Sequence, residues 1–506
     1  MAQGTIRIAL LSALCAGSAW AEGPTIRIDS GLVSGLENGP ATVFRAIPYV
    51  APPVGPLRWK PPKPVKAWPG VRKAETPGPA CPQKVMPGVP NLGGYFGPTS
   101  EDCLTLDVTA PRVAPDRKAG RAPVMVWVYG GGNIAGATNL PSYDAANFAR
   151  DGVIVVAMNY RLGPLGFFAH PSLTAEAPRD QSLASYGLMD QIAALKWVKR
   201  NIAAFGGDAG NVTLFGESAG GQDVLQLMAT AAARGLFQRA IVQSGGGWDR
   251  PIALAEAETR GVALATRLGL AGAGATTDQL RAVQAEDLIA RSAGGGPVVD
   301  GRLIRRSARE AFAGGEAAAV PLIIGSNSNE ASLMAATGMA APTQVAKASP
   351  ALRAAYGAEA GTEAGFARAL FNDGAMGAPA RWIAARASAR APAWLYYFSY
   401  VPERQRGIRP GTNHASEIPF VFESLDAVPG RTPLITPSER AAATLAHSCW
   451  VAFARAGRPD CAGGQAWPTY GPSSDQLLEF GDPAGVRSHF RKAQLDAQDA
   501  AAGAKP

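Results

Sequence analysis

Two continuous apolar runs set the strongest limit on what this chain can fold into. They are Val124–Tyr129 (VMVWVY) and Val153–Met158 (VIVVAM), and neither alternates between apolar and polar residues. Such runs are typical of strands buried on both faces, which occur in parallel sheets covered by helices. After them, apolar residues recur at helical spacing over 187–207. The alternation predicts an α/β protein with a mainly parallel sheet and helices on both faces.

Further strand candidates follow along the chain. They lie at 212–215 (VTLF), 240–243 (AIVQ), 320–324 (VPLII) and 394–401 (WLYYFSYV). The Ala- and Arg-rich stretches 251–315 and 335–390 are predicted to be helical excursions from this sheet. No repeat, heptad pattern or Pro/Gly-rich linker divides the chain. We therefore expect one domain over 22–491, followed by a flexible tail over 492–506.

The first 21 residues have the pattern of a signal peptide. Arg7 precedes a short apolar stretch, Ile8–Ala16, and an Ala-x-Ala cleavage pattern ends at Ala21. The apolar stretch is about half the length that a membrane span needs, which disfavours a membrane anchor. We therefore expect an exported protein, periplasmic or fully secreted, whose cleavage removes Cys15. The four cysteines that stay suit an oxidising compartment.

Charge and motif content exclude several other classes of protein. The chain has 48 Lys and Arg against 40 Asp and Glu, and the positive charges are scattered. We therefore expect no nucleic-acid partner. Neither a Cys/His cluster with zinc spacing nor a Gly-rich phosphate-binding motif is present, so no metal and no cofactor are predicted. No later apolar stretch is long enough for a membrane span.

The segment that carries chemistry is Gly216-Glu217-Ser218-Ala219-Gly220, directly after one strand candidate and before a helical pattern. A serine on a tight strand-to-helix turn projects its hydroxyl, and flanking glycines let the chain double back without collision. The start of the helix directs N–H groups at a developing oxyanion. A second glycine run, Gly130–Gly132, follows another strand candidate and allows backbone N–H groups to approach a substrate oxygen.

A serine hydroxyl needs a base, and the chain has only four histidines. His170 lies upstream of the serine in a Pro-flanked loop, His447 lies within a helical pattern, and His489 lies near the tail. His414 follows the strand candidate at 394–401 and is the predicted base.

An acid that orients the base is expected between the serine and the histidine in chain order. Glu330 follows the strand candidate VPLIIG and fits this position. Ligands gather at the carboxyl ends of the strands in open α/β sheets, which is where Ser218, Glu330 and His414 would all lie.

With these residues placed, the chain resembles the type-B carboxylesterases, a family that includes the cholinesterases. Ordered matches run along nearly the whole chain after the signal peptide. They include Phe44–Tyr49, Leu57–Trp59, Glu101–Leu104, Asn159–Gly163, Gly187–Gln191, Phe215–Gly221, Asn329–Glu330, His414 and Glu417–Phe420. The resemblance implies an α/β-hydrolase fold, with a large, mostly parallel central sheet flanked by helices and helical insertions around the active-site gorge.

The resemblance also implies roles for single residues. The nucleophile falls on Ser218, the acid on Glu330 and the base on His414. The oxyanion-hole N–H groups fall on Gly131, Gly132 and Ala219. By family position Cys81 and Cys103 form a disulfide, and Cys449 and Cys461 are left either to pair locally or to stay free. The implied reaction is hydrolysis of a small ester through an acyl-enzyme, without a metal.

Several positions depart from the family pattern. Asn133 stands where many relatives have an aromatic residue, which fits either a more polar pocket or a structural hydrogen bond. Gln222 and Asp223 replace small or apolar residues, and fit either a polar substrate or stabilisation of a helix N-terminus. Together with Trp248, after Ser244, Asn133 and Gln222 are the candidate substrate contacts. The loop from Cys81 to Cys103 contains Tyr95 and Phe96 but no Trp, which argues against cation–π selection of a quaternary ammonium.

Two other functions remain as alternatives. One is a non-catalytic, cholinesterase-like binding protein, although such proteins typically lack the nucleophile or the base. The other is a lipase, which differs from an esterase only in its substrate.

Overall fold

The computed structural model describes residues 21–84, 97–112, 121–248, 252–292, 294–337, 345–346, 348–428 and 430–504. The predicted signal peptide up to residue 20, together with Tyr95 and Phe96, lies outside the described residues.

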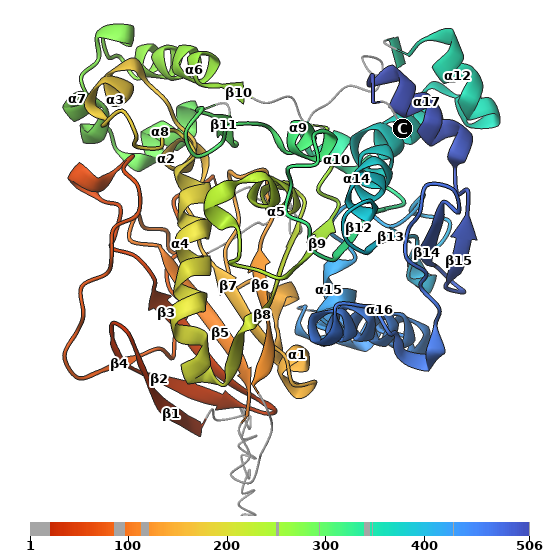
Figure 1. Ribbon diagram of the computed structural model, residues 1–506, viewed down its shortest axis with the longest axis horizontal. Helices are drawn as coiled ribbons and strands as arrows, with labels where there is room; N and C mark the ends of the chain where they lie inside the picture. Colours follow the sequence, from red (N-terminus) through yellow and green to blue (C-terminus); the bar gives the residue numbers. More distant parts are fainter. Residues whose placement is uncertain are drawn as a thin grey trace, which may run out of the picture.

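A thirteen-stranded sheet forms the centre of the described structure (Figure 1). Its strands are β1 (Ala21–Ile28), β2 (Gly31–Asn38), β3 (Ala41–Pro48), β4 (Val71–Lys73), β5 (Thr105–Pro111), β6 (Ala122–Val128), β7 (Ile154–Met158), β8 (Gly207–Glu217), β9 (Arg239–Gln243), β12 (Leu322–Asn327), β13 (Ala393–Phe398), β14 (Gln476–Phe480) and β15 (Gly485–Ser488). Their order is β1-β2-β3-β5-β7-β6-β8-β9-β12-β13-β14-β15, and β4 pairs with β2.

The middle of the sheet is parallel and the ends are antiparallel. Every neighbouring pair from β7 through β14 is parallel. Along the other half, the pairs β1–β2, β2–β3, β3–β5 and β5–β7 are antiparallel, and β4 pairs with β2 in parallel. The last pair, β14–β15, is antiparallel. Strands β6 and β7 contain the two apolar runs, and Val124–Val128 and Ile154–Met158 are buried throughout. The prediction of a mostly parallel sheet flanked by helices is therefore confirmed.

Helices connect and flank these strands. They are α1 (Ala146–Arg150), α2 (Gly163–Gly166), α3 (Pro171–Glu176), α4 (Tyr186–Asn201), α5 (Ala219–Ala229), α6 (Leu254–Arg267), α7 (Thr277–Ala282), α8 (Ala285–Arg291), α9 (Ala308–Ala313), α10 (Ser332–Thr337), α12 (Pro350–Tyr356), α13 (Glu363–Phe371), α14 (Ala378–Ser388), α15 (Ile418–Val421), α16 (Pro437–Ala456) and α17 (Lys492–Ala501). In the described part of the chain, none of these helices is both long and apolar enough to cross a membrane.

The longest helix, α16, shows how local sequence sets these boundaries. Thr436 and Glu439 form a capping box at its start, where each side chain accepts a bond from the backbone N–H of the other. Gly457 ends the helix in a left-handed conformation, with φ 74°, which glycine adopts without a steric cost. The helix buries Trp450 and Phe453 in the main core.

The two predicted helical excursions lie at the same end of the molecule. Helices α6, α7 and α8 gather on one side, with the short parallel pair β10 (Ile252–Ala253) and β11 (Val298–Val299). Helix α12, in the second excursion, lies on the opposite side, across α9 and α10 in Figure 1, and packs against α17 near the end of the chain.

The prediction of a flexible tail from residue 492 is wrong. Residues 492–501 form helix α17, which buries Leu495 at 5% exposure. The guanidinium of Arg381, in α14, lies 2.5 Å from Asp496 and 2.7 Å from Asp499. A polar, Ala-rich helix gives no apolar signal in its own sequence, and its partner lies more than a hundred residues upstream.

Candidate active site

The nucleophile candidate lies on the turn between β8 and α5. Ser218 has φ 56° and ψ −126°, a strained conformation for a residue with a side chain, and it is partly exposed. Close packing explains the glycine two residues along. A Cβ on Gly220 would lie 2.1 Å from the carbonyl oxygen of Val128. The turn therefore holds the serine hydroxyl at the carboxyl end of β8, where the strand-to-helix motif predicts it.

Glu330 and His414 come together from loops after β12 and β13. The Oε2 atom of Glu330 lies 2.5 Å from Nδ1 of His414, and both side chains are buried. The other oxygen of Glu330, Oε1, accepts bonds of 2.6 Å from the Ser244 hydroxyl and from the backbone N–H of Asn327. These donors hold the carboxylate in place, and its contact with Nδ1 leaves Nε2 as the free nitrogen of a neutral imidazole.

The Nε2 atom of His414 points to the nucleophile turn. It lies 3.0 Å from Oε1 of Glu217, the residue directly before Ser218. Among the described residues, neither Nε2 of His414 nor Oε1 of Glu217 has a hydrogen-bond partner. Contacts between a catalytic base and its nucleophile are often loose without a substrate and tighten in the complex.

Buried carboxyl groups control the charge of His414. Burial disfavours the imidazolium, but Glu217 and then Glu330 outweigh it, and the pKa of His414 is raised. Burial also raises the pKa of Glu217, against the opposing effect of His414. A third carboxyl, Glu417, has a raised pKa because of its burial, and it accepts a 3.0 Å bond from the Gln243 amide.

The glycine loop after β6 lies against the nucleophile. A Cβ on Gly130 would come 2.8 Å from the Cβ of Ser218, so only glycine fits there. Gly131 and Gly132 follow with φ 95° and 65°, which glycine adopts readily. Ala219 is the first residue of α5, and the family pattern assigns the oxyanion N–H groups to Gly131, Gly132 and Ala219.

A cavity of about 490 Å³ opens at Gly132. Its other lining residues include Phe167 and Phe168, directly after α2, and Leu264, Arg260 and Arg267 of α6. The walls next to the glycine loop are mostly apolar, with positive charge on the α6 side. This cavity can hold a substituent of a substrate whose reacting oxygen lies at the glycine loop.

The three candidate substrate contacts lie in different places. Asn133 is 2% exposed, and its amide donates to Asp223, which favours the structural hydrogen bond over a polar pocket. Gln222 is partly exposed and lines a separate small cavity of about 80 Å³ together with Arg309. Trp248 packs under the Arg309 guanidinium, 5.7 Å from the ring centroid.

The other three histidines take no part in this site. His170 is fully buried, and its Nε2 lies 3.0 Å from the carbonyl oxygen of Gly272. His447 is packed within α16, and His489 lies on the surface, 3.7 Å from Asp475.

One side-chain group in the described residues has the spacing of a metal site, namely Asp151, Glu423 and His447. The guanidinium of Arg150 lies 2.6 Å from Asp151 and 2.7 Å from Glu423. An arginine already neutralises this group, so its donors fit an ion-pair network better than a cation.

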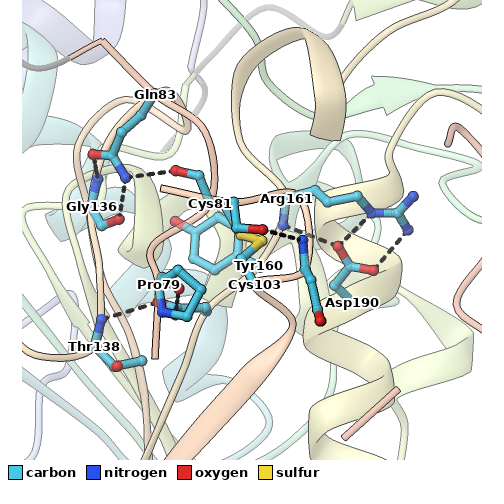
Figure 2. Close-up of a disulfide and its surroundings, with 12 residues drawn as sticks. Pro79, Cys81, Gln83, Cys103, Gly136, Thr138, Tyr160, Arg161 and Asp190 are labelled. Atoms are coloured by element: carbon cyan, nitrogen blue, oxygen red, sulfur yellow. Dashed lines mark hydrogen bonds and ion pairs between the residues drawn. A yellow bond between two sulfur atoms is a disulfide. The ribbon is translucent and has the colours of Figure 1, made fainter. Parts of the chain in front are cut away.

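The expected disulfide between Cys81 and Cys103 is confirmed, and Cys449 and Cys461, which the sequence left open, are also bonded. Figure 2 shows the first disulfide and its neighbour Gln83, whose amide bonds the N–H and the carbonyl of Gly136 at 2.9 and 2.8 Å. Gly136 lies a few residues after the oxyanion glycines, so Gln83 ties the disulfide loop to the end of that segment.

Sequence reasoning missed the support around the imidazole. Glu217 lies inside the serine motif and Glu417 lies three residues after His414, but the sequence pattern predicted no role at the site for either carboxyl group. Ser244 lies directly after β9, and its position at the carboxyl end of a strand is the one signal that could have marked it. The contacts of Glu217 with His414 and of Ser244 with Glu330 depend on the register of neighbouring strands, which sequence spacing does not give.

A serine on a strand-to-helix turn, followed in chain order by a carboxylate and a histidine after later strands of a mostly parallel sheet, defines an α/β-hydrolase.

Comparison with known proteins narrows this class. A profile described as "Carboxylesterase family" matches residues 22–364 and 358–498. The chain is 36% identical over 484 residues to a fumonisin B1 esterase of Sphingopyxis macrogoltabida, covering 90% of this chain and 86% of that protein. It is 35% identical over 476 residues to the para-nitrobenzyl esterase of Bacillus subtilis, covering 88% of this chain and 93% of that protein. A solved PNB esterase structure matches with a TM-score of 0.79 at 32% identity, and the match covers 94% of this chain and 99% of that chain. The chain belongs to the carboxylesterase family and is a carboxylic-ester hydrolase.

Proposed function

We propose that this esterase works through an acyl-enzyme on Ser218, with His414 as general base and acid and Glu330 as the group that orients it. The observation that carries the proposal is the 2.5 Å contact between Glu330 and His414, whose other ring nitrogen points to the turn that bears Ser218.

In the acylation half, His414 takes the hydroxyl proton on Nε2 as Oγ of Ser218 bonds to the ester carbonyl carbon. The negative charge moves to the carbonyl oxygen, which the N–H groups of Gly131, Gly132 and Ala219 stabilise. The C–O bond to the alcohol then breaks, and His414 returns its proton to the leaving oxygen. Glu330 stabilises the imidazolium throughout.

Deacylation repeats these steps with water. His414 removes a proton from the water as its oxygen bonds to the acyl carbon, and the same N–H groups stabilise the second oxyanion. The bond to Ser218 then breaks, the serine regains its proton from His414, and a carboxylic acid leaves.

A serine variant tests the mechanism. We expect Ser218→Ala to abolish turnover of a short-acyl nitrophenyl ester, at least about 10³-fold, while thermal unfolding stays close to that of the starting protein. Ser474→Ala, at an exposed serine far along the chain, is the matched control and keeps full activity. Undiminished activity in a folded Ser218→Ala protein would falsify the nucleophile.

An organophosphate probe separates this function from a non-catalytic, cholinesterase-like binding protein. A stoichiometric adduct mapped to Ser218 by peptide mass spectrometry supports the esterase, and no adduct supports the binding protein. A lipase is distinguished by a rate jump once the substrate exceeds its micellar concentration.

The relatives act, by name, on fumonisin B1 and on para-nitrobenzyl esters. We propose small esters of this kind as substrates, with one substituent in the cavity beside Gly132. A panel of esters varied separately in the acyl and alcohol groups tests this proposal. Equal rates across the panel would contradict a selective pocket.

We also propose that the protein is exported, to the periplasm or beyond. The signal-peptide pattern before Glu22 and the two disulfides support this proposal. Mass spectrometry of the mature protein would find Glu22 as its first residue. A protein that retains Ala21 and the residues before it contradicts cleavage at this site.

A further inference from the structure

Two of the departures from the family pattern meet inside the molecule. The amide Nδ2 of Asn133, directly after the oxyanion glycines, donates to Oδ1 of Asp223 at 3.2 Å. The second oxygen of Asp223, Oδ2, accepts a 2.6 Å bond from Nε2 of Gln191, in α4. Asp223 is therefore bonded to the glycine loop on one side and to α4 on the other.

Burial excludes both roles that the sequence left open for Asp223. Its exposure is 0%, so it does not contact a substrate, and its side chain accepts from two side-chain amides rather than from the first N–H groups of α5. Burial raises the pKa of Asp223 to about 7. Within the described residues, none of the ion pairs of the structure includes Asp223, so no cation offsets the cost of its burial.

The bonded residues connect the two sources of oxyanion donors. Asp223 lies on α5, whose first residue is Ala219, and Asn133 follows Gly131 and Gly132. The backbone of Asn133 is left-handed, with φ 58°, and its carbonyl accepts a 2.7 Å bond from the N–H of Gly163. Asn133 is thus held by its main chain and by its side chain.

We propose that Asp223 is a positioning residue for the oxyanion hole, which acts through Asn133 and is itself held by Gln191. The Asn133–Asp223 bond sets the distance between the glycine loop and α5, and hence between the N–H groups of Gly131 and Gly132 and that of Ala219. A shift of about 1 Å in such groups costs on the order of 100-fold in rate. The inference rests on the proposed oxyanion hole.

Replacing Asp223 by its neutral isostere Asn separates the effect of the hydrogen bonds at this position from the effect of the negative charge. In Asp223→Asn, the side-chain oxygen can still accept from one amide, and its new N–H₂ can donate to Oδ1 of Asn133 or Oε1 of Gln191, both buried and without a partner among the described residues. In Asp223→Leu, both amides lose their acceptor. Asn133→Ala removes the tether from the other end.

The test measures kcat, KM and inhibition by a trifluoromethyl ketone, whose adduct with Ser218 places an oxyanion in the hole. We expect Asn133→Ala and Asp223→Leu to lower kcat about 10- to 100-fold and to raise the inhibition constant by a similar factor, with KM within threefold. For Asp223→Asn, we expect kcat, KM and the inhibition constant all to stay within threefold of the starting protein. We expect kcat of the double variant Asn133→Ala/Asp223→Leu to be no lower than kcat of the more impaired single variant, because both changes break the same tether.

Asp499→Leu, in α17, is the control for a loss of stability alone, and lowers the unfolding temperature without changing kcat. The proposal is overturned if folded Asn133→Ala keeps kcat within threefold, or if the losses fall on KM while ketone affinity is unchanged. Failure of the proposed function would appear separately, as activity in Ser218→Ala or as no organophosphate adduct in the starting protein. If Asp223→Leu does not fold, Asn133→Ala decides the outcome.

Discussion

At the scale of single residues, the imidazole of His414 lies among buried carboxyl groups. Glu330 contacts Nδ1, and Glu217 lies 3.0 Å from Nε2. These negative neighbours raise the pKa of His414, while the base in the proposed mechanism must be neutral. Activity is therefore expected to rise with pH through the neutral and mildly alkaline range, as the imidazolium loses its proton.

Glu217→Gln tests the origin of this pH dependence. The change removes a negative charge beside Nε2, which destabilises the imidazolium and lowers the pKa of His414. We expect the acid limb of kcat/KM to move to lower pH by about one unit, a change of about 1.4 kcal/mol in the free energy of protonation. Glu316→Gln, at an exposed surface pair, leaves the profile in place. An acid limb that stays at the same pH, or moves to higher pH, would contradict the assignment of the raised pKa of His414 to Glu217.

Ser244→Ala tests the support of the acid. The change removes one of two donors to Oε1 of Glu330, and the N–H of Asn327 remains. Hydrogen bonds to charged groups contribute about 1.5–3 kcal/mol, so we expect kcat/KM to fall at least about 10-fold. Steady-state kinetics with a nitrophenyl ester measure the fall. A variant whose kcat/KM matches the starting protein would show that the Asn327 N–H alone holds Glu330.

The proposed nucleophile and base could be predicted because their sequence motifs determine both the residue type and its position at the end of a strand. Ser218 follows from its glycines, and His414 from a choice among four histidines. Glu217, Ser244 and the Asn133–Asp223 contact could not be predicted, since each depends on side chains that meet across strands or helices far apart in the sequence.

At the scale of elements, an ion-pair cluster joins α14 to α17. The side chain of Arg381 is 8% exposed, and it contacts Asp496, Asp499 and, at 3.6 Å, Asp475. Apolar runs and helical periodicity predicted the buried strands and α4, but α17 has neither signal. Its helix is held by charges whose partners are 115 and 118 residues away.

Truncation after Arg491 tests this cluster. It removes Asp496 and Asp499 and leaves the buried guanidinium of Arg381 with Asp475 only. Unpairing a buried charge costs about 3–5 kcal/mol, so we expect a clear fall in the midpoint of thermal unfolding. The control Lys492→Ala breaks only an exposed pair one helical turn apart, worth about 0.5 kcal/mol or less. If both variants unfold at the temperature of the full chain, the cluster does not stabilise the fold.

At the scale of the whole molecule, the parallel centre of the sheet collects the site from distant segments. Ser218 follows β8, Glu330 follows β12 and His414 follows β13. The disulfide between Cys81 and Cys103 adds a further distant segment through Gln83 and Gly136. The antiparallel strands β1, β2, β3 and β5 had no comparable sequence signal; β2, for example, alternates between buried and half-buried residues and has no long apolar run.

Replacing Cys81 and Cys103 by Ser tests the link between this disulfide and the site. Opening a loop of 22 residues is expected to cost about 3 kcal/mol of stability. We also expect kcat to fall, because Gln83 no longer holds Gly136 firmly. The matched change at Cys449 and Cys461 lowers stability without lowering kcat. Equal kcat in both double variants would show that the first disulfide only stabilises the fold.

The cluster around Arg381 also has a consequence for how the protein is made. Arg381 is synthesised 115 and 118 residues before its partners Asp496 and Asp499. A nascent chain therefore cannot complete this cluster until α17 has been synthesised. A chain that stops before α17 would leave this guanidinium with Asp475 only, and we expect it to open more readily to proteases.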